Sequence, residues 1–256
     1  MRYQIRADCT CAPSFVSRND VYDVRVGSER EKILPAQLER RVYERLRDDI
    51  ASGLLRQGDQ LVEARLASDL GVSKTPVREA LIRLQRDGLV EIEPYRGARV
   101  LELSPDDVRQ ILELRELLEC HIARELAATR PPGVLEALEA TVVRGRAALA
   151  KGDEVGVADA LTEFSDVFSA GSPNSRLAGV LTELRGVLLL IGSTSLHAEG
   201  REARSLNEHA RILATLKKGD GDAAAAATAK HIASVERDTL DVAPGGREVA
   251  AGLSQP

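Results

Sequence analysis

The sequence is poor in aromatic residues and contains no long apolar run. Aromatic residues make up 3% of the 256 residues, and tryptophan is absent. No apolar stretch approaches the roughly 20 residues that a bilayer-spanning helix needs. The first ten residues carry charges and lack the apolar segment of a signal peptide. We therefore expect a cytoplasmic protein that has no membrane partner.

Cysteine is equally scarce. The chain has three, Cys9, Cys11 and Cys120, and an odd number in a long chain excludes a disulfide framework. Cys9 and Cys11 form a C-x-C pattern, but no further cysteine or histidine follows before Cys120. A zinc site needs about four nitrogen or sulfur ligands, so we interpret the pair as unpaired thiols in a loose arm.

Helix-forming residues are abundant, and the charge is unevenly distributed. The net charge is −5, which is unusual for a protein that binds nucleic acid. Residues 35–101 are close to neutral, however, and the acidic excess lies within residues 102–243. The first of these segments can therefore present a local basic face.

Residues 35–102 show the element order of a winged helix-turn-helix domain. The spacing of Leu38, Val42, Leu46 and Ile50 predicts an amphipathic helix that begins near Pro35. Turn residues and apolar periodicity then predict two further helices and a β-hairpin, at 61–70, 73–87, 89–93 and 98–101. Residues 1–34 and 244–256 lack a sustained period, so we expect a poorly ordered arm and a flexible tail.

Residues 105–243 are expected to form a second domain made only of helices. Ser104 is a good N-cap and is followed by proline and two aspartates, which is typical of a helix start. Six helices are predicted, at 105–129, 133–150, 153–170, 174–198, 201–218 and 220–241. The fold class is therefore mainly α, with an N-terminal winged helix-turn-helix and a C-terminal bundle.

The predicted third helix carries the residue types that read DNA. A helix-turn-helix inserts its second helix into the major groove, with residues near the N-terminus of that helix at the base edges. An arginine in the wing can enter the adjacent minor groove, where a glycine permits close approach. The predicted DNA-binding residues are Ser73, Lys74, Thr75 and Arg78 on the helix, and Arg96 and Gly97 in the wing. The alternative is that these basic side chains are merely solvated.

Three segments in this region resemble the GntR family of repressors. They are Gln57-Gly58-Asp59-Gln60-Leu61, the run from Leu66 to Leu81, and Arg83 to Val90. The resemblance covers residues 36–101 and implies that Ser73, Lys74 and Arg78 contact the operator. The first basic position is more often arginine in the family. Lys74 cannot form the bidentate contact with DNA that an arginine forms there. A further arginine that contacts DNA in the family is replaced here by Ala64.

The C-terminal half resembles the FadR-type branch, with an all-helical (FCD-like) effector domain. The order and spacing of Glu113-Leu114-Arg115, Glu119, Phe164, Asn174, Glu208-His209 and His231 fit over residues 105–241. Many members hold a metal with an Asp and a His on one helix and two later His. His209 and His231 match the later pair, but Leu161 and Ser165 occupy the first two positions. Since leucine cannot bind a metal, we expect no metal cofactor and regard His209 and His231 as weak candidate ligands.

The resemblance implies an effector site formed by Arg115, Ser165, His209 and His231. A guanidinium that faces a cavity can hold a carboxylate in bidentate fashion, so Arg115 is the expected anchor. Alternatively, Arg115 forms a salt bridge with Glu119 one helical turn away, and the two histidines are simply hydrogen-bonded within the bundle.

Taken together, these patterns predict a sequence-specific DNA-binding transcriptional regulator, acting as a repressor. We expect a homodimer on a palindromic operator, controlled by a small carboxylate or acyl effector. The alternatives are a constitutive dimeric DNA-binding protein that binds no ligand, and an enzyme that uses the two histidines. The sequence lacks a nucleophile motif and a phosphate-binding loop, so we expect no enzymatic activity.

Overall fold

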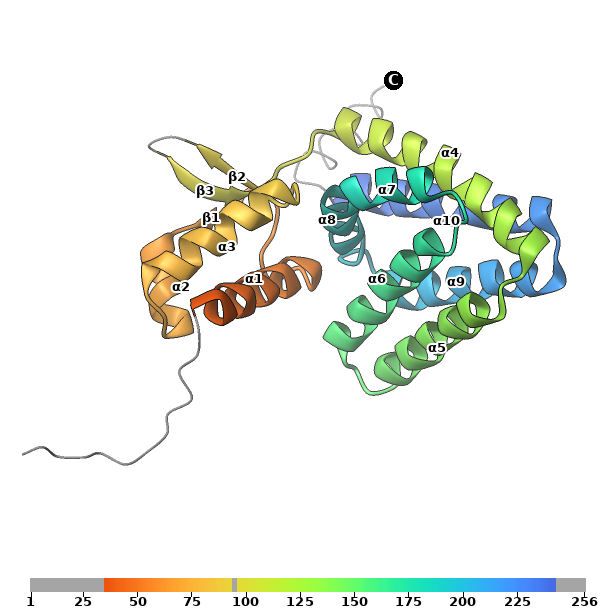
Figure 1. Ribbon diagram of the computed structural model, residues 1–256, viewed down its shortest axis with the longest axis horizontal. Coiled ribbons are helices and arrows are strands. Elements are labelled where there is room, and N and C mark those ends of the chain that lie inside the picture. Colours follow the sequence, from red (N-terminus) through yellow and green to blue (C-terminus); the bar gives the residue numbers. More distant parts are fainter. Residues whose placement is uncertain (1–34, 94–95, 243–256) are drawn as a thin grey trace, which may run out of the picture. The chain divides into compact units, whose positions relative to one another are not determined.

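The structure is a computed structural model, and it describes residues 35–93 and 96–242. The predicted N-terminal arm, with Cys9 and Cys11, and the predicted C-terminal tail lie outside the described residues. Within the described part, the chain is mainly α: ten helices accompany one small sheet. Figure 1 shows the order of these elements.

The first segment forms the expected winged helix-turn-helix. Three helices precede the wing: α1 (Pro35–Ala51), α2 (Glu63–Leu70) and α3 (Lys74–Arg86). The strands are β1 (Gln60–Leu61), β2 (Val90–Glu93) and β3 (Gly97–Val100), in the antiparallel order β1-β3-β2. The short strand β1 was not expected: Leu61, predicted to begin the second helix, instead pairs with Ala98. Pairing across Gln60 and Leu61 attaches the start of α2 to the wing.

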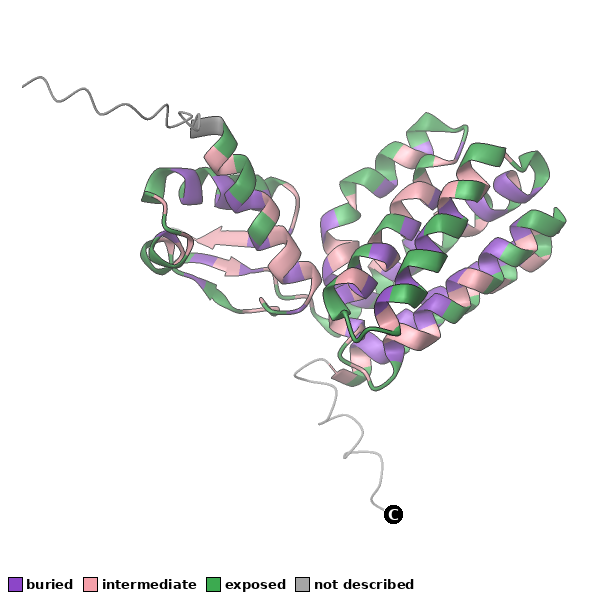
Figure 2. Cartoon of the chain, turned by 90° about the horizontal axis from the view of Figure 1, so that it is seen from below, coloured by how far each residue is buried: buried purple, intermediate pink, exposed green. Residues whose placement is uncertain are grey.

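The predicted apolar faces form the core of this domain. Leu46, Ile50, Val77, Leu81 and Leu84 are each at most 1% exposed. Figure 2 shows the buried positions on the sides of α1 and α3 that face their neighbours. This packing fixes the orientation of α3 and so leaves its opposite face toward solvent.

The second segment is a bundle of seven helices, one more than predicted. They are α4 (Pro105–Thr129), α5 (Pro132–Leu149), α6 (Glu154–Ala170), α7 (Ser175–Glu183), α8 (Arg185–Ser195), α9 (Arg201–Lys218) and α10 (Gly221–Val242). The single helix predicted over 174–198 was wrong, because the chain breaks at Leu184 and α8 turns 59° away from α7. The predicted helix contains no proline, and its three glycines, Gly179, Gly186 and Gly192, do not single out Leu184 as the break.

The bend gives α8 two packing surfaces. Leu190 is 1% exposed and packs within the same apolar core as Leu46 and Leu84. Gln57 adds a polar link: its Nε2 donates to Oγ1 of Thr194 at 2.8 Å, and its Oε1 accepts from the backbone N–H of Leu103 at 2.9 Å. Helix α8 is therefore in contact with the segment that follows α1.

No single helix among the described residues is long and apolar enough to cross a membrane. Only α7 and α8 taken together, across their bend, satisfy that test of length and composition.

Candidate functional site

The recognition helix α3 presents polar side chains at its exposed start. Gly71 ends α2 in the left-handed conformation, at φ +65°, and Ser73 is the N-cap of α3. The hydroxyl of Ser73 makes no capping hydrogen bond to the helix. Ser73, Lys74 and Thr75 are all exposed, whereas Val77 behind them is fully buried. The predicted reading face is therefore available for contact with DNA.

Arg78 lies on the same exposed face but already has a partner. Its Nε donates to Oε1 of Glu63 at 3.0 Å and its Nη2 to Oε2 at 2.8 Å, so one guanidinium edge holds both carboxylate oxygens. This hydrogen bond lowers the pKa of Glu63, which keeps it ionised. To read guanine with that edge, Arg78 has to exchange Glu63 for the base.

The wing carries the other two predicted DNA contacts. Gly97 has φ +87°, a left-handed conformation that glycine adopts without strain, and no atom lies near the position where a Cβ would be. Arg96 is exposed and its Nη1 donates to Oε2 of Glu93 at 3.2 Å. The pairing is loose and solvated, so it costs little to break on binding.

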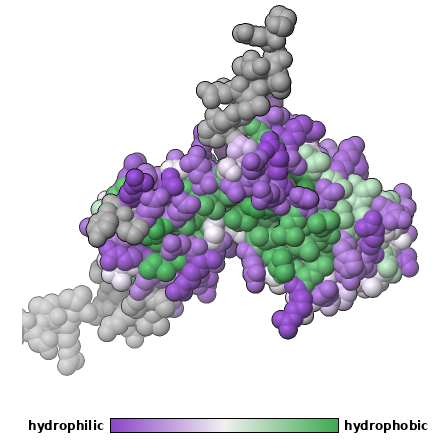
Figure 3. All heavy atoms as spheres, turned by 90° about the horizontal axis from the view of Figure 1, so that it is seen from above, coloured by the Kyte–Doolittle hydropathy of each residue, from purple (hydrophilic) through white to green (hydrophobic). Residues whose placement is uncertain are grey.

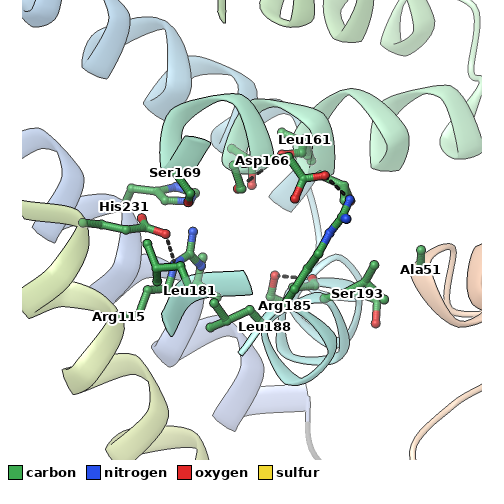
Figure 4. Close-up of a pocket in the computed structure, with 18 of the residues that line it drawn as sticks. Ala51, Arg115, Leu161, Asp166, Ser169, Leu181, Arg185, Leu188, Ser193 and His231 are labelled. Carbon is green, nitrogen blue, oxygen red and sulfur yellow. Dashed lines mark hydrogen bonds and ion pairs between the residues drawn. The ribbon is translucent and has the colours of Figure 1, made fainter. Parts of the chain in front are cut away.

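A cavity of about 340 Å³ lies among α4, α6, α7, α8, α9 and α10, and Ala51 of α1 also lines it. Arg115, Ser165, His209 and His231 all line it, and so does Leu161. Figure 4 shows Arg115 and His231 on one side, the apolar Leu181 and Leu188 beside them, and Arg185 extended toward Asp166. The structure thus brings the four predicted effector contacts to one cavity with both apolar and polar walls.

Arg115 uses one of its three side-chain nitrogens to bond within the protein. Its Nε donates to Oε1 of Glu119 at 2.8 Å, and both side chains are almost fully buried. The intrahelical salt bridge considered from the sequence is therefore present. No acceptor among the described residues bonds the two Nη groups of Arg115, and these remain available to a ligand.

The two histidines are buried, which favours their uncharged forms. His209 stacks on Phe164 with ring centroids 3.9 Å apart, and the rings of His209 and His231 are 4.7 Å apart. Burial lowers the pKa of both histidines well below the usual value, and the positive charge of Arg115 lowers it further. Nδ1 of His231 lies 2.8 Å from Oε2 of Glu208, which places its proton on Nδ1 and its lone pair on Nε2.

The residues around this histidine pair do not fit a metal ion. Leu161 and Ser165 stand where the resemblance places two ligands, and the Ser165 hydroxyl is directed to the carbonyl of Leu161 at 3.4 Å. Within residues 35–93 and 96–242, no group of three or more histidine, cysteine or carboxylate side chains is arranged to hold a metal. Asp166, next to Ser165, instead pairs with Arg185.

Sequence reasoning missed a buried ionic network at the cavity wall. Arg201, at the start of α9, has no exposed side-chain surface, and it contacts Glu208 and Asp238 at 3.1 and 3.4 Å. A signal existed, because Arg201, Ser205 and His209 are spaced by four and share one helix face. Charged residues at a helix start are usually solvated, so the spacing alone does not distinguish Arg201 from a surface arginine.

The fold, the exposed start of α3 and the cavity together define a DNA-binding regulator with a ligand-sized cavity in a helical second domain. Residues 38–100 match the family model for bacterial regulatory proteins of the gntR family, and residues 110–234 match the FCD domain. The chain belongs to the GntR family, in the branch with an all-helical effector domain.

Individual relatives agree with this assignment. An HTH-type transcriptional regulator from an unstable DNA locus of Streptomyces ambofaciens is 30% identical over 200 residues, which cover 78% of this chain and 84% of that protein. The HTH-type transcriptional repressor RspR of Escherichia coli K12 is 26% identical over 201 residues, 78% of this chain and 88% of RspR. A GntR transcriptional regulator from Rhodococcus sp. RHA1 has the same fold, with TM-score 0.68 and 24% identity over 79% of this chain and 97% of its own.

The buried histidines predict a pH-dependent stability. Each has a folded-state pKa below its unfolded-state value, so the unfolded chain takes up protons first as pH falls. The free energy of unfolding is therefore expected to fall below about pH 6.5, by up to about 1.4 kcal/mol per pH unit for each histidine. Urea unfolding between about pH 7 and pH 5.5 measures this slope.

The matched variants are His209→Gln, which removes one titrating group, and His121→Gln, whose ring is 57% exposed. His209→Gln should flatten the slope more than His121→Gln does. An equal slope in wild type and His209→Gln would show that His209 is not held neutral.

Proposed function

We propose that the protein is a sequence-specific transcriptional repressor whose operator affinity is controlled by a small carboxylate or acyl effector. The observation that carries the proposal is the cavity that Arg115, Ser165, His209 and His231 line together, in a chain that also carries an exposed DNA-reading helix. Its apolar walls suit an acyl or hydrocarbon body. The unbonded Nη groups of Arg115 suit a carboxylate.

In this proposal Ser73, Lys74, Thr75 and Arg78 read the major groove while Arg96 and Gly97 follow the minor groove. Arg78 supplies the sequence discrimination, since a bidentate arginine–guanine contact is worth about 1–3 kcal/mol against a wrong base. Glu63 holds the same guanidinium edge when DNA is absent, so the side chain is already extended on the protein surface.

We propose a homodimer that binds a palindromic operator, because one recognition helix reads few bases and a two-fold protein reads a two-fold site. Exposed apolar surface supports association through the helical domain. Leu114 and Leu117 on α4 are 39% and 68% exposed, and Figure 3 shows hydrophobic surface gathered on one face of the molecule. Such surface commonly marks an interface.

Helix α8 supports a physical route from effector to DNA reader. Leu188, Gly192 and Ser193 of α8 line the cavity, while Leu190 of the same helix packs in the core beneath α1 and α3. A ligand that displaces α8 therefore disturbs Leu190 and the hydrogen bond between Gln57 and Thr194. To release DNA tenfold, the ligand must favour the free form by about 1.4 kcal/mol.

The protein is further proposed to act in the cytoplasm without a metal cofactor and without enzymatic activity. Leu161 and Ser165 remove two of the four metal ligands, and the sequence has no nucleophile motif or phosphate loop. The repressor role draws on RspR, which is named a transcriptional repressor. The remaining alternative is constitutive DNA binding, for which the cavity would have no occupant.

Arg78→Ala is expected to lower the affinity for a selected operator by about 1–3 kcal/mol and to flatten the preference between operator sequences. The reason is the loss of the Nε–Nη2 edge of Arg78, which is exposed and which holds Glu63 in bidentate fashion when DNA is absent. Fluorescence anisotropy with the DNA sequence selected from a random pool, at fixed salt, measures the change.

Arg144→Ala is the control, because Arg144 lies on α5 and pairs with Glu163 of α6, away from α3. It should leave operator affinity unchanged. An Arg78→Ala protein that binds the operator as well as wild type would mean that another element reads the DNA.

The purified protein is expected to contain no stoichiometric zinc, nickel or manganese, since the ligand set is incomplete. Elemental analysis by mass spectrometry on protein never exposed to a chelator checks this. About one metal per chain, lost in the His209→Ala variant, would contradict it.

A further inference from the structure

The buried side of the cavity contains a guanidinium edge without a partner. In the described part of the chain, three buried side-chain nitrogens lack a hydrogen bond: Nε and Nη2 of Arg201, and Nε of Arg204. Arg204 is 42% exposed, whereas the Arg201 side chain has no exposed surface and lines the cavity. Leaving charged donors buried and unbonded costs more than leaving neutral ones, so Arg201 stands out.

The side-chain hydrogen bond of Arg201, and its nearest contacts with two carboxylates, all involve Nη1. Its Nη1 donates to Oγ of Ser234 at 2.6 Å, and the carboxylates of Glu208 and Asp238 lie 3.1 and 3.4 Å from it. Nε and Nη2 form the other edge of the guanidinium, and neither makes a hydrogen bond within the described part of the chain. Thus Arg201 is anchored on one side and unused on the other.

The unused edge is the one that grips a carboxylate elsewhere in this chain. Arg78 uses its Nε and Nη2 to hold both oxygens of Glu63, at 3.0 and 2.8 Å. This side-on fork matches the spacing of two carboxylate oxygens, which a single water molecule does not. The chemistry that fits Arg201 is therefore a carboxylate.

The two carboxylates beside Arg201 do not depend on it alone for a partner. Asp238 is also bonded by Arg204 at 2.8 Å, and Glu208 accepts from Nδ1 of His231 at 2.8 Å. Both carboxylates thus have partners besides Arg201. The charges of Arg201, Arg204, Glu208 and Asp238 sum to zero. Burial lowers the pKa of Arg201, and a bound anion would favour its charged form.

We propose that the Nε–Nη2 edge of Arg201 binds the carboxylate of the effector, in a bidentate contact on the cavity wall. This inference rests on the proposed effector role of the cavity and deepens it. The edge has no exposed surface in this structure, so a ligand must move part of the lining to reach it. That movement gives the ligand a conformational consequence. The Nη groups of Arg115, which lines the same cavity, can bond the remaining lone pairs of the same carboxylate.

The test is calorimetric titration of the full chain with acetate, butyrate, hexanoate and benzoate, and with the amide of each. Arg201→Lys keeps a positive charge beside Glu208 and Asp238 but removes the fork. The acid that binds wild type most tightly should bind Arg201→Lys at least about tenfold more weakly, while its amide is unaffected. Arg211→Lys, an exposed arginine on the same helix, should behave as wild type.

Three outcomes of the titration would contradict the proposal, and they separate it from the proposed function. An acid that binds Arg201→Lys as well as wild type removes the role of Arg201 but leaves the effector cavity standing. Amides that bind as tightly as acids likewise exclude carboxylate recognition only. If no acid or amide binds and none alters operator affinity, the proposed function fails together with this inference.

A crystal structure of wild type with the tightest acid gives a second readout should Arg201→Lys fail to fold. The two carboxylate oxygens should lie about 2.7–2.9 Å from Nε and Nη2 of Arg201. A carboxylate held by Arg115 alone would overturn the proposal.

Discussion

The structure depends on neutralising charges that the helical bundle takes out of water. Arg115, Glu119, Arg201 and Asp238 are at most 6% exposed, and buried ions are tolerated only when they are paired and hydrogen-bonded. The bundle meets this demand by pairing Arg115 with Glu119 and Arg201 with two carboxylates, and by keeping both histidines uncharged. The remaining donors, on Arg115 and Arg201, are the part of the network that protein groups do not satisfy.

Those donors belong to residues that line a cavity together with α6, α7 and α8, and α8 also packs against the DNA-binding domain. A single helix therefore adjoins both the candidate effector contacts and the core that orients α3. Leu188 and Leu190 are two residues apart, and they point into the cavity lining and into the reader core respectively. Because protein interiors are close-packed, this arrangement gives a steric route by which a proposed ligand in the cavity would act on the recognition helix.

Much of this arrangement could be predicted from the sequence. Apolar periodicity located α1, α3 and α4 closely, and the capping residues Ser73 and Ser104 marked two helix starts correctly. Periodicity failed at Leu184, since a bend between two amphipathic helices leaves both patterns intact, and at β1, which is two residues long. The family resemblance grouped His209 with His231. The part played by Arg201 depends on Asp238 of another helix, which the pattern along one segment of the chain does not show.

The measurement that tests the account most directly is the operator dissociation constant with and without a saturating carboxylate. The acid that raises the melting temperature of the protein most, among acetate, butyrate, hexanoate and benzoate, serves as the probe. The account predicts that this acid weakens operator binding by about tenfold, which corresponds to about 1.4 kcal/mol of coupling, and that the operator weakens binding of the acid by the same factor. An operator dissociation constant that stays the same with the acid bound would contradict control of DNA binding through the cavity.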